Sequence, residues 1–408
     1  MRDPVDHVRE LAVGIGPRGA TTEGERRGSE YARREMERWA ASVKVEPFAS
    51  CPSLSWPWGL VALLLLASSV LIWVRPWLAV ATAAAGFVAF AGLARGSFEV
   101  GRLFPGRPSR NVLGIVRPRG EVRHRVILAA HVDTTRSALF YHPRRLHLFR
   151  LNHILNITTS GGLLLFSLLA ALRIPPAVVW WQVLSLPLAV IALYGGYVLL
   201  HRELFCDYIP GANDNASGVA VALSVGEAVA AEPLETTELW CLITGCEEVG
   251  YAVGMDRFVR AHIGELRDAD ILVLDSVGAG HIRYLTGEGI MGYLPMAPDL
   301  VSLAAEVAGT FPEWDIRGTR FGLGYTDATP ALMRGLRALA LFTLDDRGLI
   351  RNYHWPSDTL ENIEAETLRR VTTYTLALVR AIDRRRATGD STPPVSGTRH
   401  SHGGGGTS

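Results

Sequence analysis

This sequence has almost no lysine, no paired cysteines and no excess of charge of one sign. Among 408 residues Lys44 is the single lysine, so arginine carries nearly all of the positive charge. The net charge of +1 gives no electrostatic reason to expect a nucleic-acid partner. The four cysteines have no paired spacing, which argues against both a disulfide framework and a cysteine-ligated zinc site (Cys51, Cys206, Cys241, Cys246). The opening MRDPVDHVRE also lacks the apolar core of a signal peptide.

Charged residues are also absent from four long apolar runs. Hydrophobic residues make up 48% of the chain, a high share for a soluble protein. The runs lie at 56–74, 77–94, 154–172 and 181–200; an arginine directly follows each of the first three, and His201-Arg202 follows the fourth. A run of about 18 residues is long enough to cross the roughly 30 Å hydrocarbon core of a bilayer. Tryptophans near the run ends are typical of interfacial anchors (Trp56, Trp58, Trp73, Trp77, Trp180, Trp181). We therefore expect about four transmembrane helices in two hairpins, 55–94 and 151–200; hairpins buried in a soluble core are the alternative.

Outside these hairpins the chain alternates apolar runs with helical patterns. The runs NVLGIV, RVILAA, ELWCLIT, ILVLDSV and LRALALFT read as strands, and VKVEPF alternates like one more. The stretch from Pro298 to Ala308 and the segments ASGVAVALSVGEAVA and LENIEAETLRRVTTYTLALVRAIDRRR read as helices. Such alternation predicts an α/β fold with a mostly parallel mixed sheet flanked by helices.

The hairpins divide the predicted catalytic domain into three pieces. We expect them at 1–54, 95–150 and 201–385, followed by a disordered, low-complexity tail at 386–408. Each hairpin returns the chain to the side of the membrane that it left, so all three pieces lie on one face. Arginines concentrate at that end of the runs, whereas the opposite loops carry only Arg75 and Arg173. The positive-inside bias then predicts a multi-pass protein of the bacterial plasma membrane with its catalytic domain in the cytoplasm.

Five short motifs lie where a parallel sheet places a functional site, just beyond strand ends. They contain His131-Val-Asp133, Asp214-Asn215, Glu247-Glu248, Asp275 and His354. Each motif alone is weak, because a lone His-x-Asp or an Asp after a strand is usually structural. Their occurrence together, in order and each at a strand end or in the following loop, makes the signal strong.

These side chains form a set of nitrogen and oxygen ligands suited to Zn²⁺, Mn²⁺ or Co²⁺. Two such metals, bridged by a carboxylate, lower the pKa of a shared water and polarise a carbonyl group. Asp133 is spaced to fix the tautomer of His131 from beside the metal. An adjacent glutamate pair can divide its work between metal binding and proton transfer.

With these motifs the chain resembles the co-catalytic di-zinc metallopeptidases of the bacterial leucyl aminopeptidase, aminopeptidase Y and glutamate carboxypeptidase type. The resemblance covers about residues 5–385 apart from the apolar runs, including the opening IGPR. It implies that two Zn²⁺ ions are bound, with Mn²⁺ or Co²⁺ as substitutes. It further implies one metal on His131 and Asp275, another on Glu248 and His354, and a bridging Asp214.

The same resemblance implies the remaining catalytic roles. Glu247 is the expected general base, Asp133 orients His131, and Tyr353 stabilises the oxyanion or else simply packs. The peptide bond between Asp214 and Asn215 is expected to be cis.

Three features depart from the family. A usual Ser-Asp-His-x-Pro-Phe segment is replaced by Thr-Asp-Ala-Thr-Pro-Ala at 326–331, so the substrate class cannot be carried over. Cys246 precedes the glutamate pair and reads as inert packing. The second hairpin is inserted between Asp133 and Asp214, which brings the site close to the membrane.

We expect a membrane-embedded aminopeptidase that acts on peptide or amide substrates. Another amidase, carboxypeptidase or dipeptidase with the same metals is the nearest alternative, and a single-metal glutaminyl cyclase fits less well. A non-catalytic membrane-bound binding module should lack a ligand or the base, and none is missing. A transporter is disfavoured because no span has an ionisable residue at its centre. The oligomeric state stays open.

Overall fold

The core of the protein is a nine-stranded mixed sheet whose central strands run parallel and whose outer strands pair antiparallel, except that β6 and β8 are parallel. The computed structural model describes residues 2–95, 98–250, 252–290 and 292–388. Its strands follow the order β1-β2-β4-β3-β5-β9-β6-β7, and β8 pairs with β6. The strands are β1 (Ser42–Ser50), β2 (Arg107–Val116), β3 (His124–His131), β4 (Thr237–Thr244), β5 (Asp270–Leu274), β6 (His281–Glu288), β7 (Leu294–Pro295), β8 (Arg317–Phe321) and β9 (Arg337–Leu344).

The sheet is less parallel than the sequence predicts. Strands β4, β3, β5 and β9 run parallel to one another, but β2 pairs antiparallel with both β1 and β4, and β9 pairs antiparallel with β6. The predicted strands all form, and the central ones are buried on both faces, as expected for near-continuous apolar runs. The mixed α/β class is therefore correct, whereas "mostly parallel" holds only for the centre.

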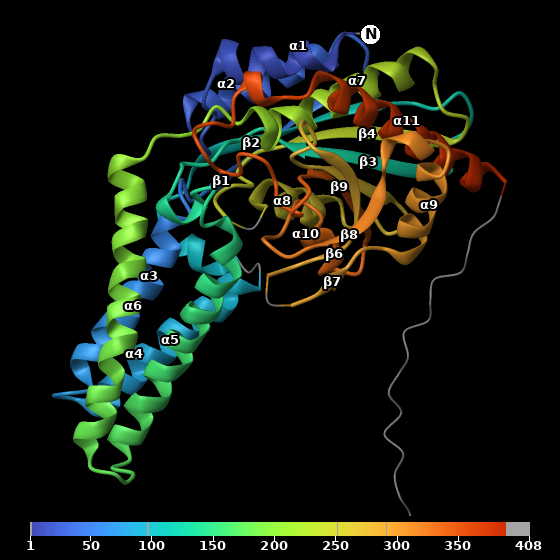
Figure 1. The fold of residues 1–408 in the computed structure, drawn as a ribbon. Helices are drawn as coiled ribbons and strands as arrows, with labels where there is room; N and C mark the ends of the chain where they lie inside the picture. Colours follow the sequence, from blue (N-terminus) through green and yellow to red (C-terminus); the bar gives the residue numbers. More distant parts are fainter. Residues whose placement is uncertain (1, 96–97, 251, 291, 389–408) are drawn as a thin grey trace, which may run out of the picture.

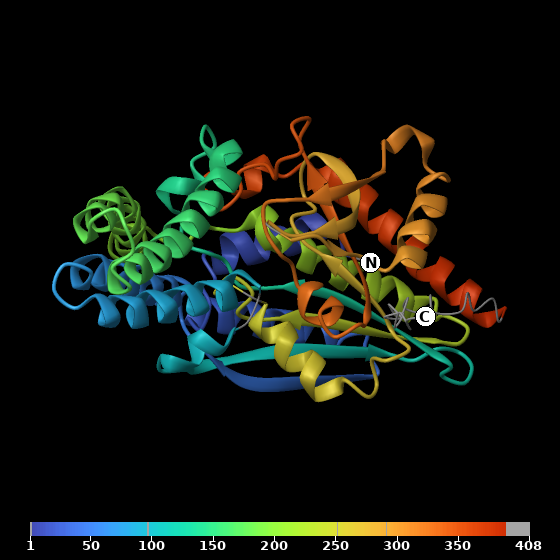
Figure 2. The same ribbon diagram turned by 90° about the horizontal axis from the view of Figure 1, so that it is seen from below.

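Helices cover both faces of the sheet. Figure 1 shows α1, α2, α7 and α11 above the sheet, while α8 and α10 lie below it, as the view from below in Figure 2 also shows. The helices of this part are α1 (Pro4–Arg9), α2 (Glu23–Met36), α7 (Gly218–Ala231), α8 (Val253–His262), α9 (Pro298–Ala308), α10 (Thr329–Leu332) and α11 (Ala365–Ala387). The last of these begins five residues later than the sequence pattern suggests, after the short turn Leu360–Asn362. One large apolar core lies between these layers.

The four predicted apolar helices form a bundle that projects from the sheet (Figure 1). They are α3 (Ser55–Leu71), α4 (Pro76–Ala94), α5 (Phe149–Ala171) and α6 (Val178–Phe205). Among the residues that the structure describes, three helical segments are long and apolar enough to cross a membrane, Pro76–Ala94, Leu146–Ala171 and Val178–Phe205, whereas α3 is a shorter apolar helix. The prediction of four spans is thus met in four apolar helices but in only three of sufficient length, because α3 ends at Leu71 before the loop to Arg75.

The exterior of the bundle is apolar. Of the most apolar 18-residue windows in the three long segments, only 28%, 28% and 17% is buried inside the protein. Large side chains such as Leu63, Val88 and Trp180 are exposed instead. A water-soluble protein rarely exposes such a continuous apolar surface, which favours contact with lipid.

A buried arginine joins the bundle to the sheet. Arg202, near the end of α6, donates hydrogen bonds to Ser53, Ser55 and Thr135 at 3.2, 3.1 and 2.8 Å. It also forms an ion pair with the neighbouring Glu203 at 3.1 Å. The start of α3, the end of α6 and the loop after β3 are thus fixed to one another, which positions the bundle beside the carboxyl end of β3.

The boundaries of the predicted pieces remain interpretations. Helices α3 and α4 fill the first predicted hairpin, while α5 and α6 extend beyond 151–200 at both ends. Helix α11 continues to Ala387, two residues past the predicted end of the catalytic domain. The predicted disordered tail lies from residue 389 onward outside the described residues.

Candidate active site

The residues predicted to form the site come together at the carboxyl edge of the parallel strands. His131 is the last residue of β3, the glutamate pair follows the end of β4, and Asp275 follows the end of β5. These three strands are neighbours in the sheet, so their ends converge. Asp214 lies in the turn before α7, and His354 lies in the loop between β9 and α11. All five predicted metal ligands are buried.

The predicted ligands form two groups that share Asp214. In the first, Nε2 of His131 lies 3.3 Å from Oδ1 of Asp214 and 3.8 Å from Oδ1 of Asp275. The ligand atoms of each group lie within 4.8 Å of one another.

In the second group, Nε2 of His354 lies 3.1 Å from both Oδ2 of Asp214 and Oε1 of Glu248. The two carboxylate oxygens of Asp214 therefore face different histidines. Each group offers one imidazole nitrogen and two carboxylate oxygens, a donor set that suits zinc.

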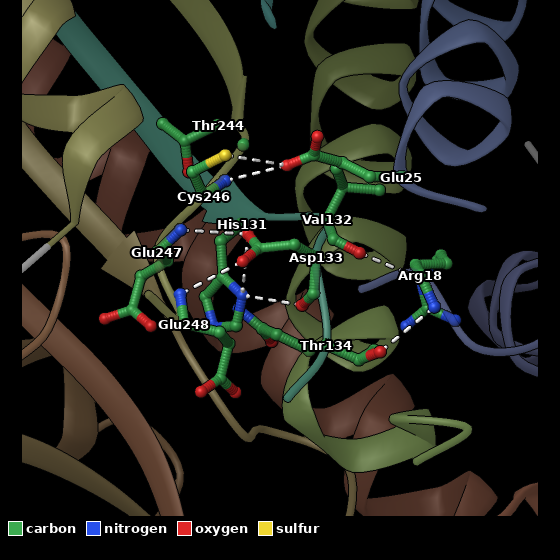
Figure 3. A network of polar contacts seen from close by, with 12 residues as sticks. Arg18, Glu25, His131, Val132, Asp133, Thr134, Thr244, Cys246, Glu247 and Glu248 are labelled. Carbon is green, nitrogen blue, oxygen red and sulfur yellow. Dashed lines mark hydrogen bonds and ion pairs between the residues drawn. The ribbon is translucent and has the colours of Figure 1, made fainter. Parts of the chain in front are cut away.

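The Asp133 carboxylate holds the glutamate pair by binding the backbone amide groups of both glutamates. Its two carboxylate oxygens accept hydrogen bonds from the amide groups of Glu247 and Glu248, both at 3.0 Å (Figure 3). Nδ1 of His131 lies 3.1 Å from the backbone carbonyl of Asp133 but 3.8 Å from its carboxylate. The carbonyl is thus the hydrogen-bonding partner of His131, and the carboxylate orients the loop that carries the glutamates.

The Asp214 turn has the predicted cis peptide bond between Asp214 and Asn215. Asp358 accepts hydrogen bonds from the amide groups of Asn213 at 2.7 Å and Asp214 at 3.0 Å. Burial raises the pKa of Asp358 to about 7. The Asn215 side chain donates to the Leu274 carbonyl at 2.8 Å, which ties this turn to the end of β5.

Arg18 braces the site from behind. Its side chain is fully buried, and its guanidinium donates to five backbone carbonyls, those of Leu11, Gly16, Val132, Pro210 and Gly211, at 2.8 to 3.0 Å. Figure 3 shows the bond to Val132, next to His131. Burial lowers the pKa of Arg18 to about 10, while the carboxylates of Asp358, Asp133 and Asp214 raise it in turn. The N-terminal segment therefore connects β3 to the Asp214 turn and places a positive charge near the acidic site.

Glu25 provides a second brace. It accepts hydrogen bonds from the Cys246 amide at 2.9 Å and from Ser109 Oγ at 2.9 Å. Burial, and then the nearby Asp133 carboxylate, raise the pKa of Glu25 to about 8. Burial raises the pKa of the Cys246 thiol well above its usual value, so this thiol is suited to packing rather than to reaction, in line with the prediction.

Glu247 faces a cavity beside the ligand groups. Burial, opposed by His131 and reinforced by neighbouring carboxylates, raises the pKa of Glu247 well above its usual value. A carboxyl group that faces a cavity beside a metal site can reach a bound substrate, which is the geometric requirement for general acid–base catalysis.

Two tyrosines pack against His354. The Tyr353 ring stacks on the His354 ring with centroids 3.8 Å apart, and Tyr141 meets it edge-on at 4.4 Å. Burial raises the pKa of Tyr353 well above its usual value, so its hydroxyl stays protonated and can donate a hydrogen bond.

The segment that departs from the family lies at the edge of the same cavity. Asp327 is buried and accepts a hydrogen bond from Thr244 Oγ1 at 2.6 Å, while Thr326 and Thr329 both donate to Glu288. Burial raises the pKa of Glu288 to about 7. The segment is therefore held in place by two buried acids, Asp327 and Glu288.

Sequence reasoning missed the residues that support the site. Asp358 stands four residues after His354, and Arg18 ends the opening IGPR, but neither role is visible without the fold. Glu25 occupies the third position after Thr22 at the start of α2, a capping pattern that indicates only a helix start. Tyr141 and Glu288 belong to no motif in the sequence that would have indicated a place at the site.

Part of the chain matches a known protein family. Residues 200–379 match the model of Peptidase family M28. No curated protein sequence matches the chain. This match, which includes Asp214, Glu248 and His354, supports the prediction of an enzyme of the zinc-dependent metallopeptidase class, together with the solved structures below.

Several solved structures share the fold. One is a Zn-dependent exopeptidase from Parabacteroides distasonis, with 14% identity and a TM-score of 0.57, covering 93% of this chain and 97% of the other. A zinc aminopeptidase from Bacillus subtilis has 15% identity and a TM-score of 0.55, with 92% and 93% covered. A glutaminyl cyclase from Bacteroides thetaiotaomicron has 15% identity and a TM-score of 0.54, with 93% and 96% covered. At this identity the likeness establishes the zinc-exopeptidase fold.

Proposed function

We propose that the chain is a membrane-embedded di-zinc aminopeptidase. The observation that carries the proposal is the pair of buried three-residue groups that share Asp214. His131 and Asp275 would hold one Zn²⁺, Glu248 and His354 the other, and Asp214 would bridge them. Mn²⁺ or Co²⁺ could occupy the same nitrogen and oxygen donors.

The proposal gives each side chain of the site a catalytic role. Bound zinc supplies Lewis acidity, which polarises the substrate carbonyl and lowers the pKa of water. Glu247 takes the proton from the attacking water and transfers it to the leaving amine. The Tyr353 hydroxyl donates to the developing oxyanion, and Asp133 keeps the glutamate pair in place through its two amide contacts.

The bundle would anchor the enzyme in the bacterial plasma membrane with the catalytic part in the cytoplasm. Arginines cluster at the sheet end of the helices, and the far loops carry Arg75 and Arg173. Arg202 contributes little to this bias, because it is buried and paired with Glu203. The predicted orientation therefore depends on the arginines in the segments 95–110 and 144–150.

Other activities on this fold are separated by substrate. A glutaminyl cyclase is present among the similar structures, but the complete second group, Asp214, Glu248 and His354, favours two metals here. A carboxypeptidase, dipeptidase or amidase would use the same metals to cleave a different bond: the last peptide bond of a chain, the single peptide bond of a dipeptide, or an amide bond outside a peptide.

Metal content measured beside activity tests the proposal. The protein is purified in detergent, bound metal per chain is measured, and aminoacyl amides are assayed with and without chelator. We expect two metals per chain and release of the N-terminal residue that chelator abolishes. Two metals without such release, but with cleavage of carboxyl-terminal residues or cyclisation of N-terminal glutamine, would replace aminopeptidase by that activity. Well-folded protein that binds no metal would overturn the enzyme proposal.

A further inference from the structure

The candidate metal site opens into the interior of the helical bundle. One cavity of about 520 Å³ is lined at one end by Glu247, Glu248, Tyr353 and His354. It continues between the apolar helices, where Trp58, Val61, Leu65, Phe90, Leu93 and Val198 line it. This volume is in the usual range for a ligand site, about 300–1,000 Å³. The catalytic groups and the bundle therefore share a single binding space.

The far half of the bundle closes this space. Ile72, Ala79 and Ala170 pack together there and are buried. Ser68 Oγ donates to the Ala79 carbonyl at 3.0 Å and lies 3.1 Å from Ser167 Oγ. The cavity is thus a pocket of limited depth beside the catalytic groups, and not a channel through the bundle.

The pocket also reaches the outer surface between α5 and α6. Leu155, Val190 and Tyr194 line it, yet 39%, 64% and 55% of their surfaces are exposed. These residues lie within the apolar exterior of the bundle, which the proposed membrane would surround. An apolar molecule in the bilayer could therefore enter sideways, without first passing through water.

One wall of the pocket is polar. Asn152, Asn156 and Ser160 line it at four-residue intervals, so they lie on one face of α5. The side-chain amide of Asn156 donates to the backbone carbonyl of Asn152 at 2.8 Å, and Ser160 Oγ donates to the backbone carbonyl of Asn156 at 2.8 Å. Each asparagine amide has two donor hydrogens and an acceptor oxygen, so the wall retains capacity for further hydrogen bonds.

This combination favours a peptide over a hydrocarbon chain. Peptide amides can exchange hydrogen bonds with the asparagines while apolar side chains contact the opposite walls. A bare alkyl chain would remove water from the asparagines without replacing its hydrogen bonds, which is unfavourable.

We infer that the enzyme acts on the N-terminal end of an apolar peptide segment delivered from the bilayer, with the residues after the scissile bond lying between α5 and α6. The inference rests on the proposed peptidase function. The N-terminal residue itself occupies the space beside Glu247, and the leaving peptide occupies the pocket in the bundle.

Filling the pocket at Gly195 tests this inference. Gly195 lines the pocket, and a Cβ added there meets no atom within 4 Å, so Gly195→Phe introduces a side chain without a backbone clash. Gly59 on α3 has equal room for a Cβ but does not line the pocket, which makes Gly59→Phe the matched control. Three substrates share one N-terminal residue: a short amide, an alkylamide, and a peptide continuing with leucines and alanines.

We expect Gly195→Phe to lower kcat/KM for the apolar peptide about tenfold or more, with the short amide affected less than about twofold. Gly59→Phe should leave both unchanged. Asn156→Leu should lower kcat/KM for the peptide and spare the alkylamide. If Gly195→Phe left the peptide unaffected, or if Asn156→Leu improved the alkylamide while sparing the peptide, the inference would be overturned.

Binding separates this result from failure of the proposed function. A fluorescently labelled apolar peptide is titrated into wild type, Gly195→Phe and Gly59→Phe in lipid nanodiscs. Should none of the three substrates be hydrolysed although metal is bound, the aminopeptidase proposal fails. Weakened binding in Gly195→Phe alone would still support the peptide pocket, and equal binding in all three proteins would overturn it.

Discussion

The catalytic part and the helical bundle place their polar groups in opposite ways. Around the sheet, charged groups such as Arg18, Glu25 and Asp133 are buried and held by several hydrogen bonds each. In the bundle, most of the interior contacts join small polar groups, as at Ser68, the buried charge of Arg202 lies at the end next to the sheet, and the exterior is apolar. This difference fits the proposal that water surrounds the first part and lipid surrounds the second. Each should therefore respond differently to the same kind of substitution.

The largest expected effect is on turnover and is confined to the catalytic part. Glu247→Gln removes the proposed base, so we expect kcat to fall by about 10²–10⁴-fold while both metals stay bound. Steady-state kinetics and metal analysis on the same preparation check this. Glu235→Gln, at an acid that pairs with Arg119 on the surface, is the control. Normal turnover in Glu247→Gln would disprove the assignment of the base.

The next largest effect separates the two parts by stability. Arg18→Met leaves five backbone carbonyls without their buried donor, so we expect a loss of about 3 kcal/mol or more in the stability of the catalytic part. Thermal unfolding followed by near-ultraviolet circular dichroism measures it, and the bundle should keep its helical signal.

Arg119→Met provides the comparison for Arg18. Arg119 forms an exposed ion pair with Glu235 at 3.2 Å, and such pairs contribute about 0–1 kcal/mol. Equal losses of stability in the two variants would show that the five hydrogen bonds of Arg18 stabilise the protein no more than an exposed ion pair does.

A charge on the bundle surface tests what surrounds it. Val88 on α4 is 69% exposed, and Val88→Lys would place a charge in the hydrocarbon core if lipid covers this face. Such a charge costs about 2.5–3.5 kcal/mol on insertion scales, so we expect a clear loss of membrane-integrated protein after alkaline extraction. Val45→Lys on β1, where the valine is 40% exposed, should be neutral. A neutral Val88→Lys would show that water surrounds the bundle.

The smallest effect concerns the interior of the bundle. Ser68→Ala removes the hydrogen bonds to Ala79 and Ser167, and interhelical contacts of this kind average about 0.6 kcal/mol in membranes. Detergent-induced unfolding should shift only slightly, and Ser302→Ala on α9 gives the baseline. A shift as large as that of Arg18→Met would contradict the division between the two parts.

The strands and the site are predictable from the sequence because their signals are local and repeated. Apolar runs such as RVILAA are long enough to require burial, and His131 follows one of them directly. Parallel neighbours bring their carboxyl ends together, so the order of the runs is enough to place the residues that follow separate strands at one edge of the sheet. The antiparallel pairing of β2 with β4, and of β6 with β9, cannot be predicted this way, because the composition of a run does not reveal the direction of the strand.

The supporting residues were hidden for a different reason. Arg18 and Asp358 act through backbone groups far away in sequence, those of Pro210 and Asn213 among them. Backbone donors and acceptors are the same at every residue, so they leave no pattern in the sequence. The cavity was equally hidden, since it depends on how α5 and α6 separate near the sheet.

The second hairpin lies between two halves of the proposed metal site. His131 precedes α5, and Asp214 follows α6, so the residues that would share a metal are synthesised on either side of two segments that we propose to cross the membrane. If the hairpin crosses the bilayer as proposed, the first half meets the second only after the chain has returned from the membrane. Membrane insertion would thereby act as a maturation step, and a chain still on its way to the membrane would be unable to degrade peptides in the cytoplasm.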